Sequence, residues 1–258
     1  MMHFWAANAH FALVVLAGSA LALCIFRARN RREHALDMGQ RNLLATNFGF
    51  FTTLYTFFLG FAVMTLWQNY SDTDTKLTQE TDLLVVEYRL SHSLKGTDKL
   101  RALLQEYAAV VAEDEWPAMN LGKGSSKAAA LYEDIWRETS SLRPQKMEDQ
   151  FVYSIMLNNL VEVNKLRHFR LLQVNGSLYP PLWVILYLGV GFTIIGFYFA
   201  SVENKISDGV YIVTTLVMIF ANLYIVIALD RPFGEPLCLS PDRFLESLQA
   251  MRAITASL

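Results

Sequence analysis

The chain has 258 residues, of which 53% are hydrophobic and 18% are charged, and its mean hydropathy is positive. An ordinary soluble domain has about 25% charged residues, so this composition argues against a soluble enzyme and excludes a disordered chain, a collagen or a small disulfide-built domain. The net charge of −2 gives no basic excess of the kind that binds nucleic acid, and Cys24 and Cys238 form neither a zinc pattern nor a disulfide framework.

Four long stretches of the sequence lack Asp, Glu, Lys and Arg. Each contains an apolar core of about 20 residues, the length that crosses roughly 30 Å of hydrocarbon. The first has no Lys or Arg before its apolar run, and that run is too long for a signal peptide. We therefore predict an all-α protein of the lipid bilayer with four transmembrane helices, at residues 4–26, 48–67, 181–201 and 209–229.

The loop at 27–47 is rich in arginine, and short basic loops stay on the cytoplasmic side of a membrane. By this rule the loop is cytoplasmic and the chain that follows the second span is outside. Anchoring at lipid headgroups is the expected role of these arginines, with a ligand site as the alternative. The arginines are Arg27, Arg29, Arg31, Arg32 and Arg41.

Residues 68–180 are polar and predict a water-facing helical domain inserted between the second and third spans. Thr97 has the position of an N-cap before a helix with apolar residues at helical spacing. Further helices are expected from Lys127 to Leu142 and from about Gln145 to Val174, the second ended by Gly176 and a pair of prolines. No strand pattern is visible, and a short tail occupies residues 230–258.

Motifs for soluble catalysis are missing from the sequence. The run Gly122-Lys123-Gly124-Ser125-Ser126 lacks the spacing of a P-loop, and the five histidines are scattered. The acidic triple Glu113-Asp114-Glu115 is interpreted as a solvated helix end, because neighbouring side chains on a helix point in different directions. We therefore expect no enzyme activity, no metal site and no cofactor.

The second predicted span carries a stripe of residues spaced 3, 4, 4 and 3 apart, which places them on one face of a helix. In a single chain such a stripe is most simply packing. Around a symmetry axis it would form a hydrophobic ring, which can gate ions by dewetting. Gly60 would let a neighbouring helix approach closely. The stripe consists of Phe50, Thr53, Phe57, Phe61 and Met64.

Several short motifs resemble the bestrophin channels, in the order and spacing of that family. The second span resembles theirs at Leu59-Gly60-Phe61 and at Trp67, Asn69 and Tyr70. Residues 159–167 and Pro180-Pro181 resemble the long helix that leads into their third span, and Pro232-Phe233-Gly234-Glu235 resembles their tail motif. Glu115-Trp116-Pro117 and Asp230-Arg231-Pro232-Phe233 are similar to signatures of the bacterial bestrophin-like domain family.

The resemblance implies a pentamer of identical subunits that conducts inorganic ions, with three neck residues on the second span. Those positions fall on Thr53, Phe57 and Phe61, with Met64 on the same stripe. The acidic run by which eukaryotic members bind calcium is replaced here by residues 236–239, so calcium gating is not expected. The resemblance also implies a cytosolic helical domain, opposite to the arginine rule, and both orientations stay open, as does the sign of the permeant ion.

We therefore expect a homo-oligomeric ion channel of a bacterial inner membrane, with Phe57 and Phe61 at its constriction. Tyr70 and Asp72 could set an electrostatic vestibule, although a solvated helix start is the simpler interpretation. The alternative is a membrane sensor or scaffold whose helical domain binds a ligand or a partner protein. An intramembrane enzyme or proton-coupled transporter is disfavoured, because His10 is the only ionisable candidate inside the spans.

Overall fold

The computed structural model describes residues 20–21, 24, 38–176, 178–199, 205–234 and 237–257, and helices form nearly all of its regular structure, with no strand in these ranges. The chain forms two compact units, each described separately below. Unit 1 comprises residues 1–69 and 177–230, and unit 2 comprises residues 70–176 and 231–258. Apart from residues 20–21 and 24, the expected span at 4–26 lies outside the described residues, as does most of the arginine loop.

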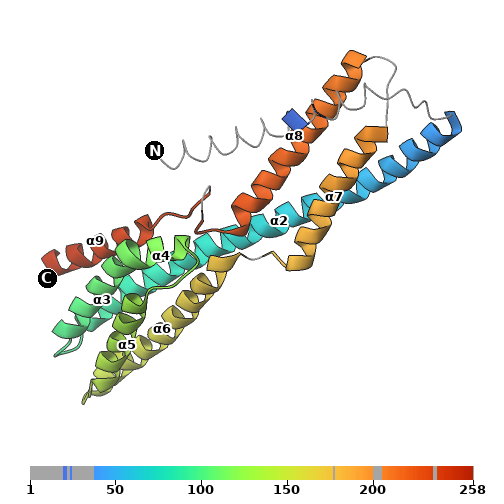
Figure 1. The fold of residues 1–258 in the computed structure, drawn as a ribbon. Helices are drawn as coiled ribbons and strands as arrows, with labels where there is room; N and C mark the ends of the chain where they lie inside the picture. Colours follow the sequence, from blue (N-terminus) through green and yellow to red (C-terminus); the bar gives the residue numbers. More distant parts are fainter. Residues whose placement is uncertain are drawn as a thin grey trace. The chain divides into compact units, whose positions relative to one another are not determined.

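Helix α2 (Met38–Ser91) is the longest element, with 54 residues (Figure 1). It contains no proline, so the pattern of backbone hydrogen bonds is not interrupted between its apolar first half and its polar second half. The helix begins within the stretch that the sequence assigns to the basic loop and continues past the expected end of the second span at residue 67. It ends in a turn where Gly96 adopts a positive φ of 77°, which glycine adopts without steric cost.

Unit 1 combines the first part of α2 with α7 (Pro180–Phe199) and α8 (Lys205–Asp230). Three stretches of the described chain are long and apolar enough to cross a membrane, namely Asn42–Ser91, Met147–Gly196 and Gly209–Asp230. They contain the apolar parts of α2, α7 and α8. Ile194 of α7 packs against Ile212 and Leu216 of α8. These apolar helices identify an integral membrane protein.

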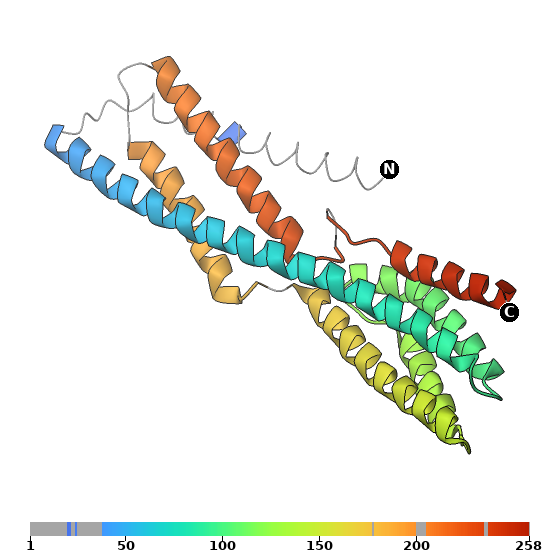
Figure 2. The same cartoon turned by 180° about the vertical axis from the view of Figure 1, so that it is seen from behind.

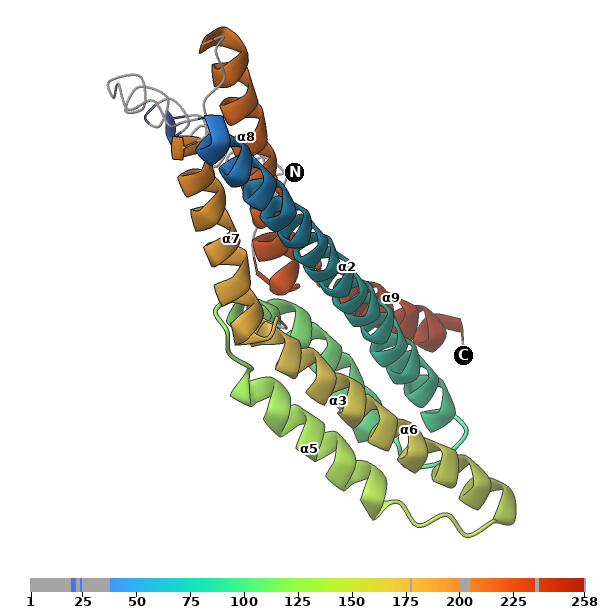
Figure 3. The ribbon, with the colours of Figure 1, turned by 90° about the vertical axis from the view of Figure 1, so that its right-hand side faces the viewer.

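Unit 2 is a helical bundle built on the second part of α2 (Figures 2 and 3). Its other helices are α3 (Asp98–Val110), the π-helix η1 (Val111–Glu115), α4 (Trp116–Asn120), α5 (Ser126–Ser141), α6 (Met147–Leu172), the 3₁₀ turn η2 (Gln173–Asn175) and α9 (Asp242–Ser257). Helix α3 packs between α5 and α9. The expected helices at 127–142 and 145–174 are thus present, with bounds shifted by one or two residues.

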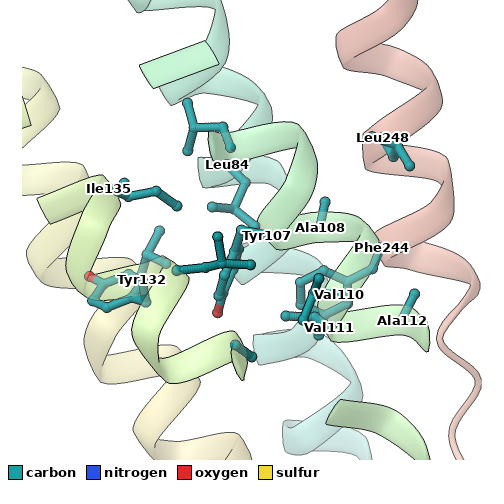
Figure 4. Close-up of a cluster of buried hydrophobic side chains, with 14 of the residues drawn as sticks. Leu84, Tyr107, Ala108, Val110, Val111, Ala112, Tyr132, Ile135, Phe244 and Leu248 are labelled. Carbon is teal, nitrogen blue, oxygen red and sulfur yellow. The ribbon is translucent and has the colours of Figure 1, made fainter. Parts of the chain in front are cut away.

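The core of unit 2 lies where these helices meet (Figure 4), around Leu84, Tyr107 and Ile135. The apolar residues that share a face in the sequence are buried there, including Leu77, Leu84 and Tyr88 of α2. Thr97 does occupy the N-cap position of α3, but its side chain does not cap the helix. Its hydroxyl donates instead to the carbonyl oxygens of Ser91 and Leu94, so the expected capping bond is absent.

Candidate functional site

The three predicted neck residues, Thr53, Phe57 and Phe61, lie with Met64 on one exposed face of α2. The exposed fractions of Phe57, Phe61 and Met64 are 69%, 56% and 62%. Thr53 is also exposed, and its hydroxyl donates to the carbonyl oxygen of Gly49 at 2.9 Å. Large apolar side chains on a helix face normally pack against something, so this face is available for lipid or for another subunit.

The opposite face of α2 is buried within unit 1, at Tyr55, Leu59, Ala62 and Leu66. These positions also follow helical spacing and lie about half a turn from the neck residues. One side of the helix is therefore committed to packing inside the chain, and the aromatic stripe is turned away from it.

Two glycines of α7 set this rotation of α2. A Cβ atom built on Gly189 would lie 2.0 Å from ring carbons of Tyr55, and one on Gly196 would lie 1.9 Å from the ring of Phe48. From the first pair to the second, the position moves seven residues forward along α7 and seven residues back along α2. The two helices therefore pack antiparallel, and each aromatic ring of α2 fills the space left by a glycine of α7. Close packing on small residues is the usual way in which membrane helices associate.

Gly60 does not have such a role among the residues that the structure describes. A Cβ atom at this position would meet no described atom within 4 Å. The expected close approach of a neighbouring helix at Gly60 stays a prediction. Trp67 is exposed, and Asn69 and Tyr70 are half-buried, with Tyr70 packing against the core of unit 2.

The exposed face of α2 that carries the neck residues becomes polar further along the helix. The positions that continue the stripe at helical spacing are exposed and polar, and two of them are acidic. They are Gln68, Asp72, Thr75, Gln79 and Asp82. The same helix face is thus aromatic in its apolar part and hydrophilic with a negative charge in its polar part.

A second constellation lies inside unit 2, where Arg170 of α6 contacts two buried carboxylates. Its Nε and Nη2 donate to the carboxylate of Glu80 on α2 at 2.9 and 3.0 Å, and Nη2 also donates to Glu115 at 2.9 Å. Arg167 donates to the other oxygen of Glu115 at 2.9 Å. Glu80 and Glu115 are fully buried. This network of four residues joins α2, η1 and α6.

Electrostatics inside the network favour the charged form of Arg170. Burial alone would lower the pKa of its guanidinium, but Glu80, Tyr107 and Glu115 raise that pKa overall. The pKa of Tyr107 is raised by burial and by the carboxylate of Glu80, so its hydroxyl stays protonated. Two carboxylates and two guanidinium groups compensate one another, which is the condition under which charges are tolerated in a core.

The network corrects the interpretation of the acidic triple. Glu113 and Asp114 are exposed as expected for a helix end, but Glu115 is buried, so that interpretation is wrong for Glu115. The physical reason is the π-helix at Val111–Glu115. A π-helix has more residues per turn than an α-helix, and here both Glu115 and Trp116 are buried.

The other motif residues in unit 2 gather around Trp116. Its ring contacts Phe233 edge-on at 5.4 Å between centroids, and Phe244 at 5.9 Å. Its indole N–H donates to the carbonyl oxygen of Leu239 at 2.9 Å. The structure therefore brings the Glu115-Trp116 and Pro232-Phe233 motifs together, although more than 100 residues separate them in the chain. The guanidinium of Arg170 lies 5.3 Å from the Phe244 ring.

The remaining motif residues have separate places. Asp230, at the end of α8 in unit 1, accepts a hydrogen bond from the backbone N–H of Leu178 at 2.7 Å. Pro117 and Arg231 are exposed, and Pro232 is buried. Gly234 is half-buried, and Glu235 lies outside the described residues.

Sequence reasoning missed Glu80 and Arg170, although a signal existed. Glu80 falls on the same helix face as Leu77 and Leu84, and Arg170 falls on the face of Val163 and Leu166. A charge on a core face predicts a buried partner of opposite charge. Within the described ranges, no three His, Cys, Asp or Glu side chains are placed to hold a metal ion.

Apolar helices combined with a helical bundle that contains a buried ion-pair network define an all-helical membrane protein. A family model of the bestrophin-like domain matches residues 12–244, and the chain therefore belongs to the bestrophin-like family. No curated protein matches the chain.

Solved structures share this fold. A variant of a bacterial bestrophin homologue from Klebsiella pneumoniae superposes with a TM-score of 0.69 at 12% identity, covering 94% of this chain and 99% of that one. A second variant from the same organism gives 0.68 at 11% identity, covering 97% and 98%. A crystal structure described as a membrane protein gives 0.70 at 11% identity, covering 95% and 98%. At such identities the likeness concerns the fold alone.

Proposed function

We propose that this protein is a homo-oligomeric ion channel whose pore is lined by α2, with Phe57 and Phe61 at its constriction and Thr53 and Met64 beside them. Bestrophins are ion channels. The observation that carries the proposal is the exposed aromatic stripe on α2, opposite a face that the chain itself buries. Identical subunits around an axis, five by resemblance to the family, would turn this stripe into stacked rings.

The physical basis of gating would be dewetting. A narrow ring of phenylalanine side chains offers no hydrogen bonds to water, so water and ions leave it unless the ring widens. Beyond the proposed span, α2 continues with exposed polar side chains at Gln68 and Asp72, as expected where a helix leaves the bilayer.

The same proposal includes the membrane layout. The spans are placed at residues 4–26, 48–67, 181–201 and 209–229, with the polar domain at 68–180 outside the bilayer. A bacterial inner membrane is the proposed location. Gly60, on the exposed part of α2, is proposed to lie against a neighbouring subunit.

The test is a recording of single-channel currents from the full-length protein in planar bilayers under a salt gradient. Phe57→Ala and Phe61→Ala should raise conductance or open time, because a smaller side chain widens the ring. Phe51→Ala is the matched control, because the Phe51 ring packs on Phe192 of α7, with 4.6 Å between ring centroids, and so faces away from the exposed stripe. This variant should leave conductance near the wild-type value.

Two results would contradict the proposal. Currents that are equal in the wild type and in both neck variants would remove the constriction from Phe57 and Phe61. Silence of all variants, together with a stoichiometric partner protein that co-purifies with the chain, would favour a sensor or scaffold. The reversal potential of a conducting protein gives the sign of the preferred ion.

A further inference from the structure

Unit 2 contains a third buried carboxylate that the ion-pair network does not include. Glu87 lies on the face of α2 that carries Glu80, seven residues or about 10 Å further along the helix. Like Glu80, it is fully buried. Glu80 accepts two hydrogen bonds from a guanidinium, whereas no cation contacts Glu87 within the described chain.

Among the described residues, the Glu87 carboxylate has a single polar contact, and that contact is long. Its Oε2 lies 3.5 Å from Nδ2 of Asn159 on α6. Its Oε1 has no hydrogen-bond partner among the residues that the structure describes. A buried ionised carboxylate without a partner is strongly unfavourable. The neutral acid suits this position better, because it carries no net charge and needs less solvation.

In the described part of the chain, no positively charged group is placed to offset the charge of Glu87. Tyr132 of α5 is the titratable group close enough to interact with it, and burial raises the pKa of that tyrosine, so it stays neutral. Tyr107 of α3 is likewise neutral. Helix α6 presents the uncharged Asn159, and its Arg167 and Arg170 are bonded to Glu115 and Glu80. Helix α9 meets this part of α2 through Thr255, which contacts Tyr88.

We propose that Glu87 is a proton-operated switch at the contact between α2 and α6. With its carboxyl protonated, the two helices pack as the structure shows. When the carboxyl ionises, the buried charge draws in water or forces the side chain out of the contact, which loosens α6 from α2. The switch at Glu87 depends only on how α2 and α6 pack in unit 2, and it does not depend on whether the protein conducts ions.

The pH range over which Glu87 ionises follows from its buried environment. Burial raises the pKa of Glu87 from 4.5 to about 8, and the contact with Asn159 lowers it only in part. Between these two values the folded protein holds a proton that the unfolded chain has released. Stability therefore falls as pH rises through this window. The switch is set for mildly alkaline conditions.

The first experiment measures the thermal midpoint Tm of the full-length protein in detergent at several values from about pH 5 to about pH 9. Glu87→Gln copies the protonated acid in shape and charge. Its Tm should exceed that of the wild type by a margin that grows with pH. Glu162→Gln is the control, because Glu162 is exposed on α6 and pairs with Lys165 at the surface. A margin for Glu87→Gln that is constant with pH would overturn the switch.

A second measurement covers the case in which the variant does not fold. In infrared difference spectra of the wild type, the C=O band of a protonated carboxyl should disappear with a midpoint near pH 8. The same titration in Glu162→Gln should be unchanged. A spectrum without any such band in the neutral range would show that Glu87 is already ionised, and the proposal would fail whether or not currents had been recorded.

Discussion

The ring of Tyr55 occupies the space that any side chain at residue 189 would need. A Cβ atom added to Gly189 would lie 2.0 Å from two carbons of that ring. A Cβ atom added to Gly191, about half a turn along the same helix, would meet no atom of the described residues within 4 Å. Residue 191 therefore has room for a side chain and residue 189 does not, because the Tyr55 ring of α2 fills the space beside Gly189.

Gly189→Ala should destabilise the protein and Gly191→Ala should not. Alanine improves helix propensity over glycine by about 1 kcal/mol, so the second variant should be neutral or slightly stabilised. Overpacking at Gly189 should cost about 1–3 kcal/mol. Thermal unfolding of both variants in detergent measures the difference. Equal Tm values would mean that Tyr55 moves aside without loss, and the notch would then not set the rotation of α2.

Arg170→Met should be strongly destabilising, because it leaves the carboxylates of Glu80 and Glu115 buried beside a single guanidinium. Breaking a buried ion pair in this way costs about 3–5 kcal/mol. The control is Arg137→Met, which removes an exposed pair with Asp134, and exposed pairs contribute about 0–1 kcal/mol. Denaturant or thermal unfolding followed by circular dichroism gives both values. A mild effect at Arg170 would show that the network rearranges around the missing charge.

Phe233→Ala should lower stability by about 3–5 kcal/mol, since this side chain is fully buried against Trp116 and its removal leaves a cavity. Phe151→Ala, at an exposed position of α6, should change stability by no more than about 0.5 kcal/mol. The quenching of tryptophan fluorescence should also increase in the first variant. If the two variants were equally stable, Phe233 would not anchor the segment after α8.

Local patterns in the sequence predicted the helices well. The helices expected at 127–142 and 145–174 differ from α5 and α6 by one or two residues at each end, because the signals that start and stop helices act within a few residues. The spacing of Phe57 and Phe61 likewise fixed their common face. Their exposure could not be predicted, because it depends on which side of α2 meets α7.

Features that depend on tertiary register were missed for the same reason. The sequence drew attention to Gly60, beside which the described part of the chain places no atom, and not to Gly189, whose role depends on its alignment with Tyr55. Glu115 was assigned to the solvent because an acidic triple usually is solvated, and its partners come from a helix about 50 residues away. The signal present in the sequence is a charge on a core face, as at Glu80 and Glu87, which helical periodicity places beside buried apolar residues.

The π-helix at Val111–Glu115 has a consequence for how this segment can change by insertion or deletion. Single-turn π-helices lie inside α-helices as one-residue widenings, so loss of one codon there would restore an ordinary α-helix. Five residues of the wider π-helix turn through about the same angle as four residues of an α-helix. Loss of an exposed residue such as Asp114 would therefore leave Glu115 and Trp116 on the faces that meet their partners. The same deletion within α3 would instead turn every later residue, up to the loop that begins at Gly122, by about 100°. The π-helix is thus the place in this segment where the chain can lose one residue with the least change in packing.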